Sequence, residues 1–479
     1  MRIGIIGAGP GGICMGIKLR EAGIHAFTIF EHAPAVGGTW FHNTYPGCAC
    51  DVPSALYSFS FELKRDWSRP YGTQPEIRAY FEHCVTKYGL APHLRLGDGI
   101  AAANWHDKRA VWSLTTEAGE QHEVDVLIGA VGMFGNPEWP DIPGLHDFTG
   151  TVFHSARWDH DHDLGGERVT VIGSAASAVQ FVPEIAPGVE QLLVFQRTPN
   201  WVLPKVDVPY TAEQLERLCT DPDALLEDRR QVWERLEGSI TFSNPAAITA
   251  AQELALQHMA IVEDPTVRAK LTPDFPHGCK RPPISNDWYP TFNRPNVELI
   301  TEAIERIDAT GITTVSQTHR PVDTIVLATG FQTTRYISTI EVTGRRGRRI
   351  ADAWSNGAQA YLGVTTAGFP NLFMLYGPNT NNGSILFMIE CQVAYVMRQL
   401  ARLDQEGLAW IDVRPDVMAD YNRSLQDDLD HVDVWNASCN NYYRGPGGYI
   451  VTQWPHTMSD YEARTAKPDD DAYETQSRD

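Results

Sequence analysis

The sequence predicts an α/β protein that contains two strand–turn–helix–strand units. The first unit begins with the apolar run Ile3–Ile6 and a glycine-rich turn, and the second begins with Val169–Ile172 and a turn at Gly173. A short buried strand followed by such a turn and a helix is typical of a Rossmann-like dinucleotide-binding domain. Residues 210–274 are rich in Glu, Leu, Ala and Gln, and they predict a helical insertion.

Composition limits the classes of function. The chain has 479 residues, of which 43% are apolar and 21% charged, and this length predicts two or three globular domains. Its net charge of −21 repels phosphate backbones and argues against nucleic acid as a partner. No apolar run reaches the roughly 18 residues of a membrane span, and no charged-then-apolar leader follows Met1. We therefore expect a soluble, cytoplasmic protein without a membrane span.

The eight cysteines are scattered along the chain, which predicts free thiols in an intracellular protein. Cys48 and Cys50 form the only close pair. One intervening residue suits neither a zinc site nor a redox pair, which needs two, and the sequence predicts no metal site.

The first turn has the spacing G-x-G-x-x-G, with its glycines at Gly7, Gly9 and Gly12. Glycines allow a tight turn and close approach of the backbone to a pyrophosphate, while the following helix offers N–H groups and the positive end of its dipole. The next strand, Ala26–Phe30, is closed by Glu31, whose carboxylate can accept hydrogen bonds from ribose hydroxyls. An acid at this place indicates an unmodified ribose, hence FAD or NAD.

The loop after this unit contains several turn formers and large aromatic residues. From Gly38 to Asp51 it has the pattern G-x-W-x4-Y-P-G-x3-D, which includes Thr39 and Trp40. Such side chains can pack on a flat ring, so we expect Gly38, Thr39, Trp40 and Asp51 to contact the same cofactor. By itself, a lone aspartate in a loop is more often a turn cap.

The second turn has the weaker spacing G-x-A-x-x-A. We expect a second dinucleotide to contact Gly173, Ser174, Ala175, Ala176, Ser177, Arg197 and Thr198. The acid that closes the following strand in the first unit is absent here, and Arg197 stands near its place. An arginine at this point favours a 2′-phosphate, hence NADPH over NADH.

The segment Phe148–Asp159 has the pattern F-x-G-x-x-x-H-x-x-x-W-D. Together with the Gly38–Asp51 pattern and both glycine-rich turns, it resembles the type I Baeyer–Villiger monooxygenases, a family of class B flavoprotein monooxygenases. The resemblance extends from Met1 to about Arg464. The Trp-Asp ending favours this family over related flavin monooxygenases that oxidise nitrogen and sulfur. We interpret His154 as a hydrogen-bonded structural residue between domains rather than a catalytic base.

The resemblance implies an NADPH-dependent flavoprotein monooxygenase. NADPH would reduce FAD, and reduced FAD would capture O2 as a C4a-peroxide that adds to a ketone and yields an ester or lactone. Arg281 would be the active-site arginine and Asp51 the carboxylate that orients it, and a guanidinium suits this role because it stabilises an anion without giving up its proton. Lys280 and Arg281 would also contact NADPH. Further FAD contacts are expected from Tyr57, Ile100 and Asn382.

The loop 377–384 opens a predicted helix from about Ile385 to Leu403, whose N-terminus would face the flavin and stabilise negative charge on the reduced ring. Tyr442 stands where the family often carries Trp, and this departure leaves the shape of the substrate pocket open. The ketone and the oligomeric state are open as well.

These observations predict four regions of the chain. Residues 1–145 and 325–465 form the FAD-binding domain, and residues 150–209 and 275–324 form the NADPH-binding domain. Residues 210–274 are the helical insertion. Residues 466–479, acidic and polar, are expected to form a disordered tail.

Three alternative functions remain at the level of the sequence. The same cofactors could oxidise sulfur or nitrogen instead of a ketone. A flavin disulfide reductase would need a redox cysteine pair, for which Cys48 and Cys50 are poorly spaced. A non-catalytic nucleotide-binding protein is favoured only by Ala175, which replaces a glycine, and is disfavoured by Arg281 and Asp51.

Overall fold

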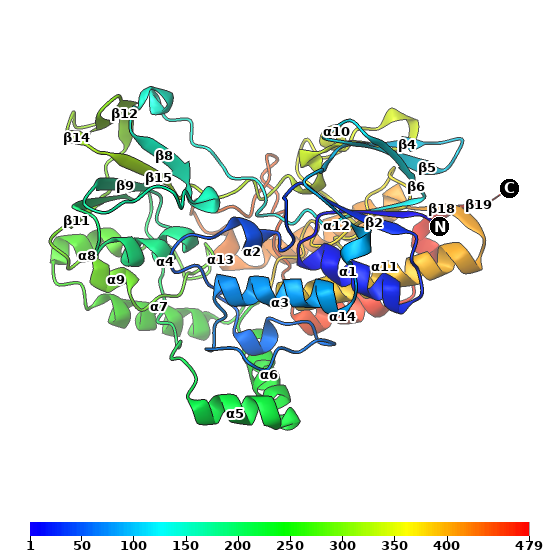
Figure 1. Cartoon of the computed structure of the whole chain (residues 1–479), viewed down its shortest axis with the longest axis horizontal. Helices are drawn as coiled ribbons and strands as arrows, with labels where there is room; N and C mark the ends of the chain where they lie inside the picture. Colours follow the sequence, from blue (N-terminus) through cyan, green and yellow to red (C-terminus); the bar gives the residue numbers. More distant parts are fainter. Residues whose placement is uncertain (479) are drawn as a thin grey trace.

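The computed structural model describes residues 1–478 and contains two parallel five-stranded sheets at opposite ends of the molecule (Figure 1). The first sheet has the strand order β17-β7-β1-β2-β3. Its strands are β1 (Ile3–Ile6), β2 (Phe27–Glu31), β3 (Leu94–Leu96), β7 (Val126–Gly129) and β17 (Leu372–Met374). The buried strands β1 and β7 are apolar on both faces, as a parallel sheet covered on two sides requires.

Helices cover one face of the first sheet, and a small mixed sheet covers the other. Helix α1 (Pro10–Glu21) packs against α3 (Gln74–Lys87) and α11 (Ile385–Gln405). On the opposite face, Gly4 of β1 approaches Leu114 and Val124 of the mixed sheet. That sheet consists of β4 (Ile100–His106), β5 (Val111–Thr116), β6 (Gln121–Val124) and β16 (Glu341–Thr343), with α10 (Ile350–Ala353) beside β16. In it, β16 is parallel to β4 and the remaining neighbours are antiparallel.

The second sheet has the strand order β11-β10-β9-β15-β8, and all of its neighbouring strands are parallel. Its strands are β8 (Thr151–His154), β9 (Arg168–Ile172), β10 (Gln191–Phe195), β11 (Val297–Ile300) and β15 (Thr324–Leu327). Helices α4 (Ala176–Ile185) and α9 (Trp288–Thr291) pack together beside it. A three-stranded antiparallel sheet is formed by β12 (Ile304–Asp308), β13 (Gly311–Thr314) and β14 (His319–Pro321).

Strand β15 corrects the predicted domain boundary. Residues 325–327 were assigned to the first domain, but β15 pairs with both β8 and β9 in the second sheet. The turn at Gly173 also packs on this strand's end, where a Cβ atom on Gly173 would lie 2.3 Å from the carbonyl oxygen of Ala328. The chain therefore leaves the second sheet after Leu327 rather than before it.

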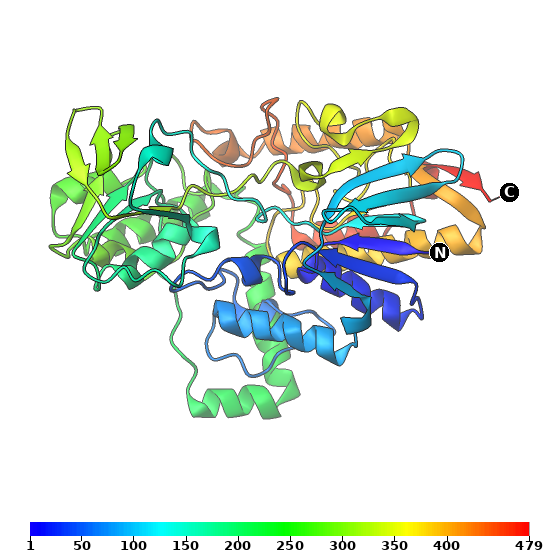
Figure 2. The same ribbon diagram turned by 45° about the horizontal axis from the view of Figure 1, so that its top comes forward.

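Helices dominate residues 210–274. They are α5 (Ala212–Thr220), α6 (Pro222–Glu237), α7 (Pro245–Met259) and α8 (Pro265–Leu271). Helices α5 and α6 project away from both sheets (Figures 1 and 2). Arg229 of α6 nevertheless anchors this region to the first domain, because its guanidinium donates to the carbonyl oxygens of Ala55 and Ser58.

Residues 466–478 are ordered, contrary to the predicted disordered tail. After β18 (Leu408–Val413), α12 (Pro415–Asp430), α13 (Asp433–Asn436) and α14 (Met458–Ala466), strand β19 (Tyr473–Ser477) pairs with β18. The side chain of Tyr473 is buried, and Trp410 donates through Nε1 to the amide oxygen of Gln476 at 2.7 Å. Composition indicated disorder because Tyr473 is the one large apolar anchor in an otherwise polar stretch.

Among residues 1–478, no helix is both long enough and apolar enough to cross a membrane.

His154 ends β8 and is almost completely buried. Its Nδ1 accepts a hydrogen bond from the backbone N–H of Ala156, and its ring lies between Trp139 and Phe331. The rest of the Phe148–Asp159 segment is also structural, since Trp158 packs edge-on against Phe181 of α4. These contacts agree with the interpretation of His154 as a structural residue.

Burial makes His154 a source of acid sensitivity. It lowers the pKa of the imidazole from 6.5 to about 4, with a smaller contribution from the charge of Arg157. Because the unfolded chain binds this proton at higher pH, the contribution of His154 to stability is complete above pH 6.5 and is lost as the pH falls toward 4. Asp412 acts in the opposite sense, because burial raises the pKa of its carboxyl to about 6.

We predict that His154→Asn reduces the loss of stability between pH 7 and pH 5 by about 2 kcal/mol. The amide oxygen of asparagine can replace Nδ1 as the acceptor for Ala156, so the variant removes the titration and keeps the hydrogen bond. Thermal unfolding midpoints at the two pH values measure the effect. The exposed His25→Asn serves as control and should change nothing. Equal pH dependence of His154→Asn and the native protein would contradict the prediction.

Candidate active site

The first glycine-rich turn is shaped to receive a phosphate-bearing ligand. Gly7 has a φ of +105°, and a Cβ atom there would lie 2.5 Å from the carbonyl oxygen of Ala130. A Cβ atom on Gly12 would lie 1.9 Å from the carbonyl oxygen of Gly7, so this glycine lets α1 pack on the turn. Gly9 is different, because its nearest neighbour would be the Cα of Gly38 at 3.5 Å. No side chain caps the N-terminus of α1, which leaves its N–H groups open to an anion.

Glu31 lies at the end of β2 and is buried. Its carboxylate accepts hydrogen bonds from the backbone N–H groups of Ala8 at 2.7 Å and Ala33 at 2.8 Å. Glu31 therefore holds the turn after β1 in place, a role that the sequence did not reveal. A carboxylate has further lone pairs, so this role is compatible with the predicted contact to a ribose.

Other residues predicted for the first site surround this turn. Gly38 has a φ of +56° and faces Gly9, and it precedes the short helix α2 (Thr39–His42). The indole of Trp40 donates to the hydroxyl of Tyr57 at 2.9 Å. Ile100 begins β4 and lies beside the end of β2, where the N–H of Asp98 donates to the carbonyl oxygen of Glu31.

Asn382 is buried, and its amide group holds several chain segments together. The Nδ2 atom donates to the carbonyl oxygens of Trp454 at 2.9 Å and Ile240 at 3.2 Å. Helix α11 starts three residues later without a side-chain cap, so its N-terminal N–H groups are open. The structure thus gives Asn382 a role in positioning the start of α11.

The second glycine-rich turn resembles the first in its backbone, but its residues pack less closely against their surroundings. Gly173 has a φ of +117°, and Ala175 stands at the uncapped N-terminus of α4. Ala175 and Ala176 are exposed, whereas Ser174 is buried and its carbonyl oxygen accepts from Asn200 at 2.8 Å. Ser177 lies in the first turn of α4.

Two cations lie together beside this second turn. Lys280 donates through Nζ to Thr198 and to the carbonyl oxygen of Pro199, and Arg197 is exposed nearby. Burial and the charge of Arg197 lower the pKa of Lys280 to about 8. Within residues 1–478 neither cation forms an ion pair with a carboxylate, although the protein carries a net charge of −21. Two unpaired cations beside an open helix N-terminus fit a phosphate dianion.

The loop that follows α2 docks on the second domain. The amide of Gln180, on α4, accepts from the hydroxyl of Tyr45 at 3.0 Å and donates to the carbonyl oxygen of Ala49 at 3.0 Å. A Cβ atom on Gly47 would lie 2.9 Å from the carbonyl oxygen of Gln180. No sequence motif marks Gln180, since it lies inside a helix that is far along the chain from the loop that it contacts.

This loop carries Asp51 to Arg281. The guanidinium donates through Nε to one carboxylate oxygen at 2.8 Å and through Nη2 to the other at 2.7 Å. The side chains are 36% and 30% exposed, so the pair is still reachable from solvent or by a ligand. The charge of Asp51 raises the pKa of Arg281 above its ordinary value despite desolvation. The two residues predicted to act together are therefore in direct contact.

Phenol groups surround the Asp51–Arg281 pair. Tyr442 lies beside the guanidinium, and Tyr376 lies near both of them. The hydroxyl of Tyr376 donates to the amide oxygen of Asn381 at 2.7 Å. Burial raises the pKa of both phenols, so they stay protonated and can donate hydrogen bonds. Tyr376 was missed by sequence reasoning, because no motif marks it.

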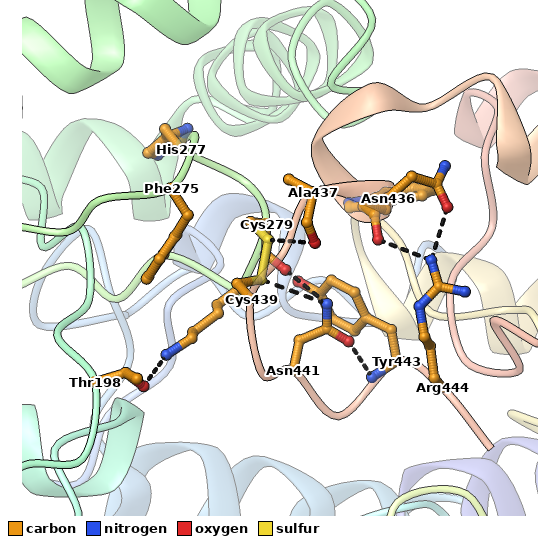
Figure 3. The surroundings of a disulfide bond; sticks show 12 residues. Thr198, Phe275, His277, Cys279, Asn436, Ala437, Cys439, Asn441, Tyr443 and Arg444 are labelled. Carbon is orange, nitrogen blue, oxygen red and sulfur yellow. Dashed lines mark hydrogen bonds between the residues drawn. A yellow bond between two sulfur atoms is a disulfide. The ribbon is translucent and has the colours of Figure 1, made fainter. Parts of the chain in front are cut away.

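A disulfide corrects the prediction that all cysteines are free. Cys279 and Cys439 are bonded, with their Cα atoms 6.4 Å apart (Figure 3). The other six cysteines are free thiols. A separation of 160 residues explains why spacing along the chain gave no hint of this pair.

The two glycine environments of the first turn predict effects of different size when a methyl group is added. Gly12→Ala places Cβ against the backbone of Gly7, and we expect it to destabilise the protein by about 1–3 kcal/mol. Gly9→Ala meets only ordinary contacts and should cost less than about 1 kcal/mol. Thermal unfolding of both variants in the absence of added ligand measures the difference. Equal destabilisation by the two substitutions would show that Gly9 is needed for packing, rather than to leave space for a ligand to approach the backbone.

Comparison with known proteins agrees with this geometry. Residues 4–232 match the family model described as pyridine nucleotide-disulphide oxidoreductase. A Baeyer–Villiger monooxygenase from Pseudomonas aeruginosa is 42% identical over 480 residues, covering 98% of this chain and 91% of the relative. Cyclohexanone monooxygenase from Rhodococcus sp. Phi1, solved with bound NADP+, has a TM-score of 0.90 at 30% identity, covering 100% of this chain and 99% of that one. An oxidised steroid monooxygenase bound to NADP has a TM-score of 0.88 at 32% identity, with the same coverage.

The likeness extends over the whole chain in both sequence and structure. It includes both parallel sheets, and the prediction of two dinucleotide-binding folds is thereby confirmed. The chain belongs to the Baeyer–Villiger monooxygenases.

Proposed function

We propose that this protein uses FAD, NADPH and O2 to insert one oxygen atom next to the carbonyl group of a ketone, which yields an ester or lactone. The observation that carries the proposal is the bidentate Asp51–Arg281 pair, which joins a loop of the first domain to the second domain. Membership of the family supports the same activity.

The residues around the two turns fit the two cofactors. FAD would bind at Gly7, Gly9 and Gly12 with its adenosine end near Glu31, and NADPH would bind at the second turn with its 2′-phosphate between Arg197 and Lys280. When bound, NADPH supplies a hydride and FAD supplies activated oxygen for transfer to the ketone.

The protein's own side chains contribute by fixing the positions of groups and by stabilising charge. Arg281 stays charged at every relevant pH, and it can stabilise negative charge that develops on oxygen as the carbonyl is attacked. Asp51 fixes the plane of the guanidinium through two hydrogen bonds, which leaves one edge free for substrate. The protonated phenol of Tyr442 adds a neutral donor beside the same space, whereas the single hydroxyl proton of Tyr376 is already donated to Asn381.

The proposal assigns FAD to residues 1–145 together with the chain after β15 and assigns NADPH to residues 150–209 with 275–327. The partners are a small ketone and O2, and the proposed location is cytoplasmic. Oxidation of sulfur or nitrogen would use the same residues and is distinguished by product analysis. Disulfide reduction through Cys48 and Cys50 is disfavoured, because burial raises the pKa of Cys48 to about 12 and that of Cys50 even further.

We predict that Arg281→Ala lowers kcat for ketone oxygenation by about 10²–10³-fold. NADPH oxidation should continue, with O2 reduced to hydrogen peroxide. Arg281→Lys is the matched control, because it retains the charge and loses the bidentate contact with Asp51. Its kcat should lie between those of the native protein and Arg281→Ala. Gas chromatography of the ester and a peroxide assay measure both products. Oxygenation by Arg281→Ala within tenfold of the native rate would contradict the proposed function.

We predict that affinity for NADP+ falls as the pH rises through about 8, because Lys280 loses the charge that attracts the 2′-phosphate. Lys280→Met should weaken binding at pH 7 by about tenfold and remove this pH dependence. Arg197→Gln should weaken binding too, and it should shift the pH dependence upward because the nearby positive charge is gone. Equilibrium titration at pH 7 and pH 9 measures each constant. NAD+ lacks the 2′-phosphate and should bind all three proteins with the same affinity. If the variants lose as much affinity for NAD+ as for NADP+, these cations do not contact the 2′-phosphate.

A further inference from the structure

The Cys279–Cys439 disulfide joins two segments that have no regular secondary structure of their own. Cys279 lies between α8 and α9 on the side of the second domain, and Cys439 follows α13 near the end of the chain. Figure 3 shows the bond between these two segments. It closes a loop of 160 residues.

The next two residues after Cys279 are held by other parts of the chain. Lys280 contacts Thr198 and Pro199 after β10, and Arg281 pairs with Asp51 in the loop after α2. Three consecutive side chains thus reach three separate segments. Their backbone is irregular until Ile284, which forms a bridge with Leu203. Arg281 lies between two fixed points, the disulfide on one side and this bridge on the other.

The partner segment reaches the same guanidinium. The side chain of Asn441 donates to the carbonyl oxygen of Cys279 at 3.0 Å and accepts from the N–H of Tyr443 at 2.9 Å. Between these residues, Tyr442 lies beside Arg281. The disulfide and the Asn441 hydrogen bond therefore tie the segment that carries Tyr442 to the segment that carries Arg281.

The bond can be reached from solvent on one side only. Cys279 is fully buried, whereas Cys439 is partly exposed and lies between the exposed residues Ser438 and Asn440. A small thiol could attack the sulfur of Cys439, so that Cys279 leaves as a thiolate and takes up a proton. A second thiol would then release Cys439 as a thiol and form the disulfide of the reductant. In a reducing compartment, disulfides are commonly transient and redox-sensing.

We propose that the Cys279–Cys439 disulfide positions Arg281 against Tyr442, and that its reduction by small thiols uncouples NADPH oxidation from ketone oxygenation. The inference rests on the proposed function and deepens it. Both cysteines are positioning residues, since they would act through Arg281 and Tyr442. The proposed oxygen transfer to the ketone uses the Arg281 guanidinium directly, so we expect oxygenation to respond to reduction more strongly than hydride transfer from NADPH to FAD does.

The test uses the purified holoenzyme before and after treatment with dithiothreitol, which is removed before the assay. Thiol titration in denaturant should find six thiols before reduction and eight after it. Reduction should lower kcat for oxygenation about tenfold and raise the peroxide released per NADPH, while NADPH oxidation changes less than about twofold. Reoxidation should restore the original ratio of ester to peroxide.

Two variants provide controls. Cys439→Ser should behave like the reduced protein and ignore dithiothreitol. Cys219→Ser removes the exposed free thiol on α5 and should keep the full response. Should Cys439→Ser fail to fold, the reversible treatment of the native protein still decides the matter. Eight thiols before reduction, or the same ratio of ester to peroxide in both redox states, would overturn the proposal.

Hydrogen exchange gives a readout that does not depend on activity. Residues 277–283 and 437–443 should exchange faster after reduction, whereas β19 should not change. If these residues exchange faster after reduction but no ester forms in either redox state, the proposed function is refuted. The structural link between the two segments would then still hold. Ester formation with unchanged exchange and coupling would refute the positioning role alone.

Discussion

The bidentate contact between Asp51 and Arg281 connects the parts of this protein that the chemistry must bring together. Asp51 ends a loop that the first domain sends onto α4 of the second, where Gln180 and Gly47 fix its path. Arg281 lies on an irregular segment that the Leu203–Ile284 bridge and a disulfide hold from either side. A guanidinium with its plane fixed by two hydrogen bonds keeps one edge at a defined place. This docking places a cation between the two dinucleotide-binding folds.

The two turns share a backbone design but differ in charge. Both use a glycine with positive φ after a buried strand and a helix without a side-chain cap. After the first, the buried Glu31 holds the turn through Ala8 and places a carboxylate at the end of β2. Beside the second, Arg197 and Lys280 lie together, and within residues 1–478 neither forms an ion pair with a carboxylate. We expect this difference in local charge to favour different nucleotides at the two turns.

Much of the fold could be predicted because its signals are local. The strands Ile3–Ile6 and Gln191–Phe195, both glycine-rich turns and the helices of residues 210–274 follow from short apolar runs and periodicity. The errors also have physical causes. Strand β15 pairs with β8 and β9 instead of belonging to the first domain, and no property of Thr324–Leu327 reveals its neighbours. The polar stretch around Tyr473 is ordered because one buried aromatic and the edge of β18 hold it.

The sequence by itself determined the two nucleotide-binding units, the charge that distinguishes them and, through family resemblance, the pairing of Asp51 with Arg281. The tertiary structure decided which surfaces of those units meet. Gln180 contacts the loop before Asp51 across 131 residues, Cys279 bonds Cys439 across 160, and Tyr442 reaches Arg281 from the far end of the chain. Such contacts depend on how the domains dock, and docking is governed by the summed packing of many residues. A pattern within one stretch of sequence records only that stretch's own propensities.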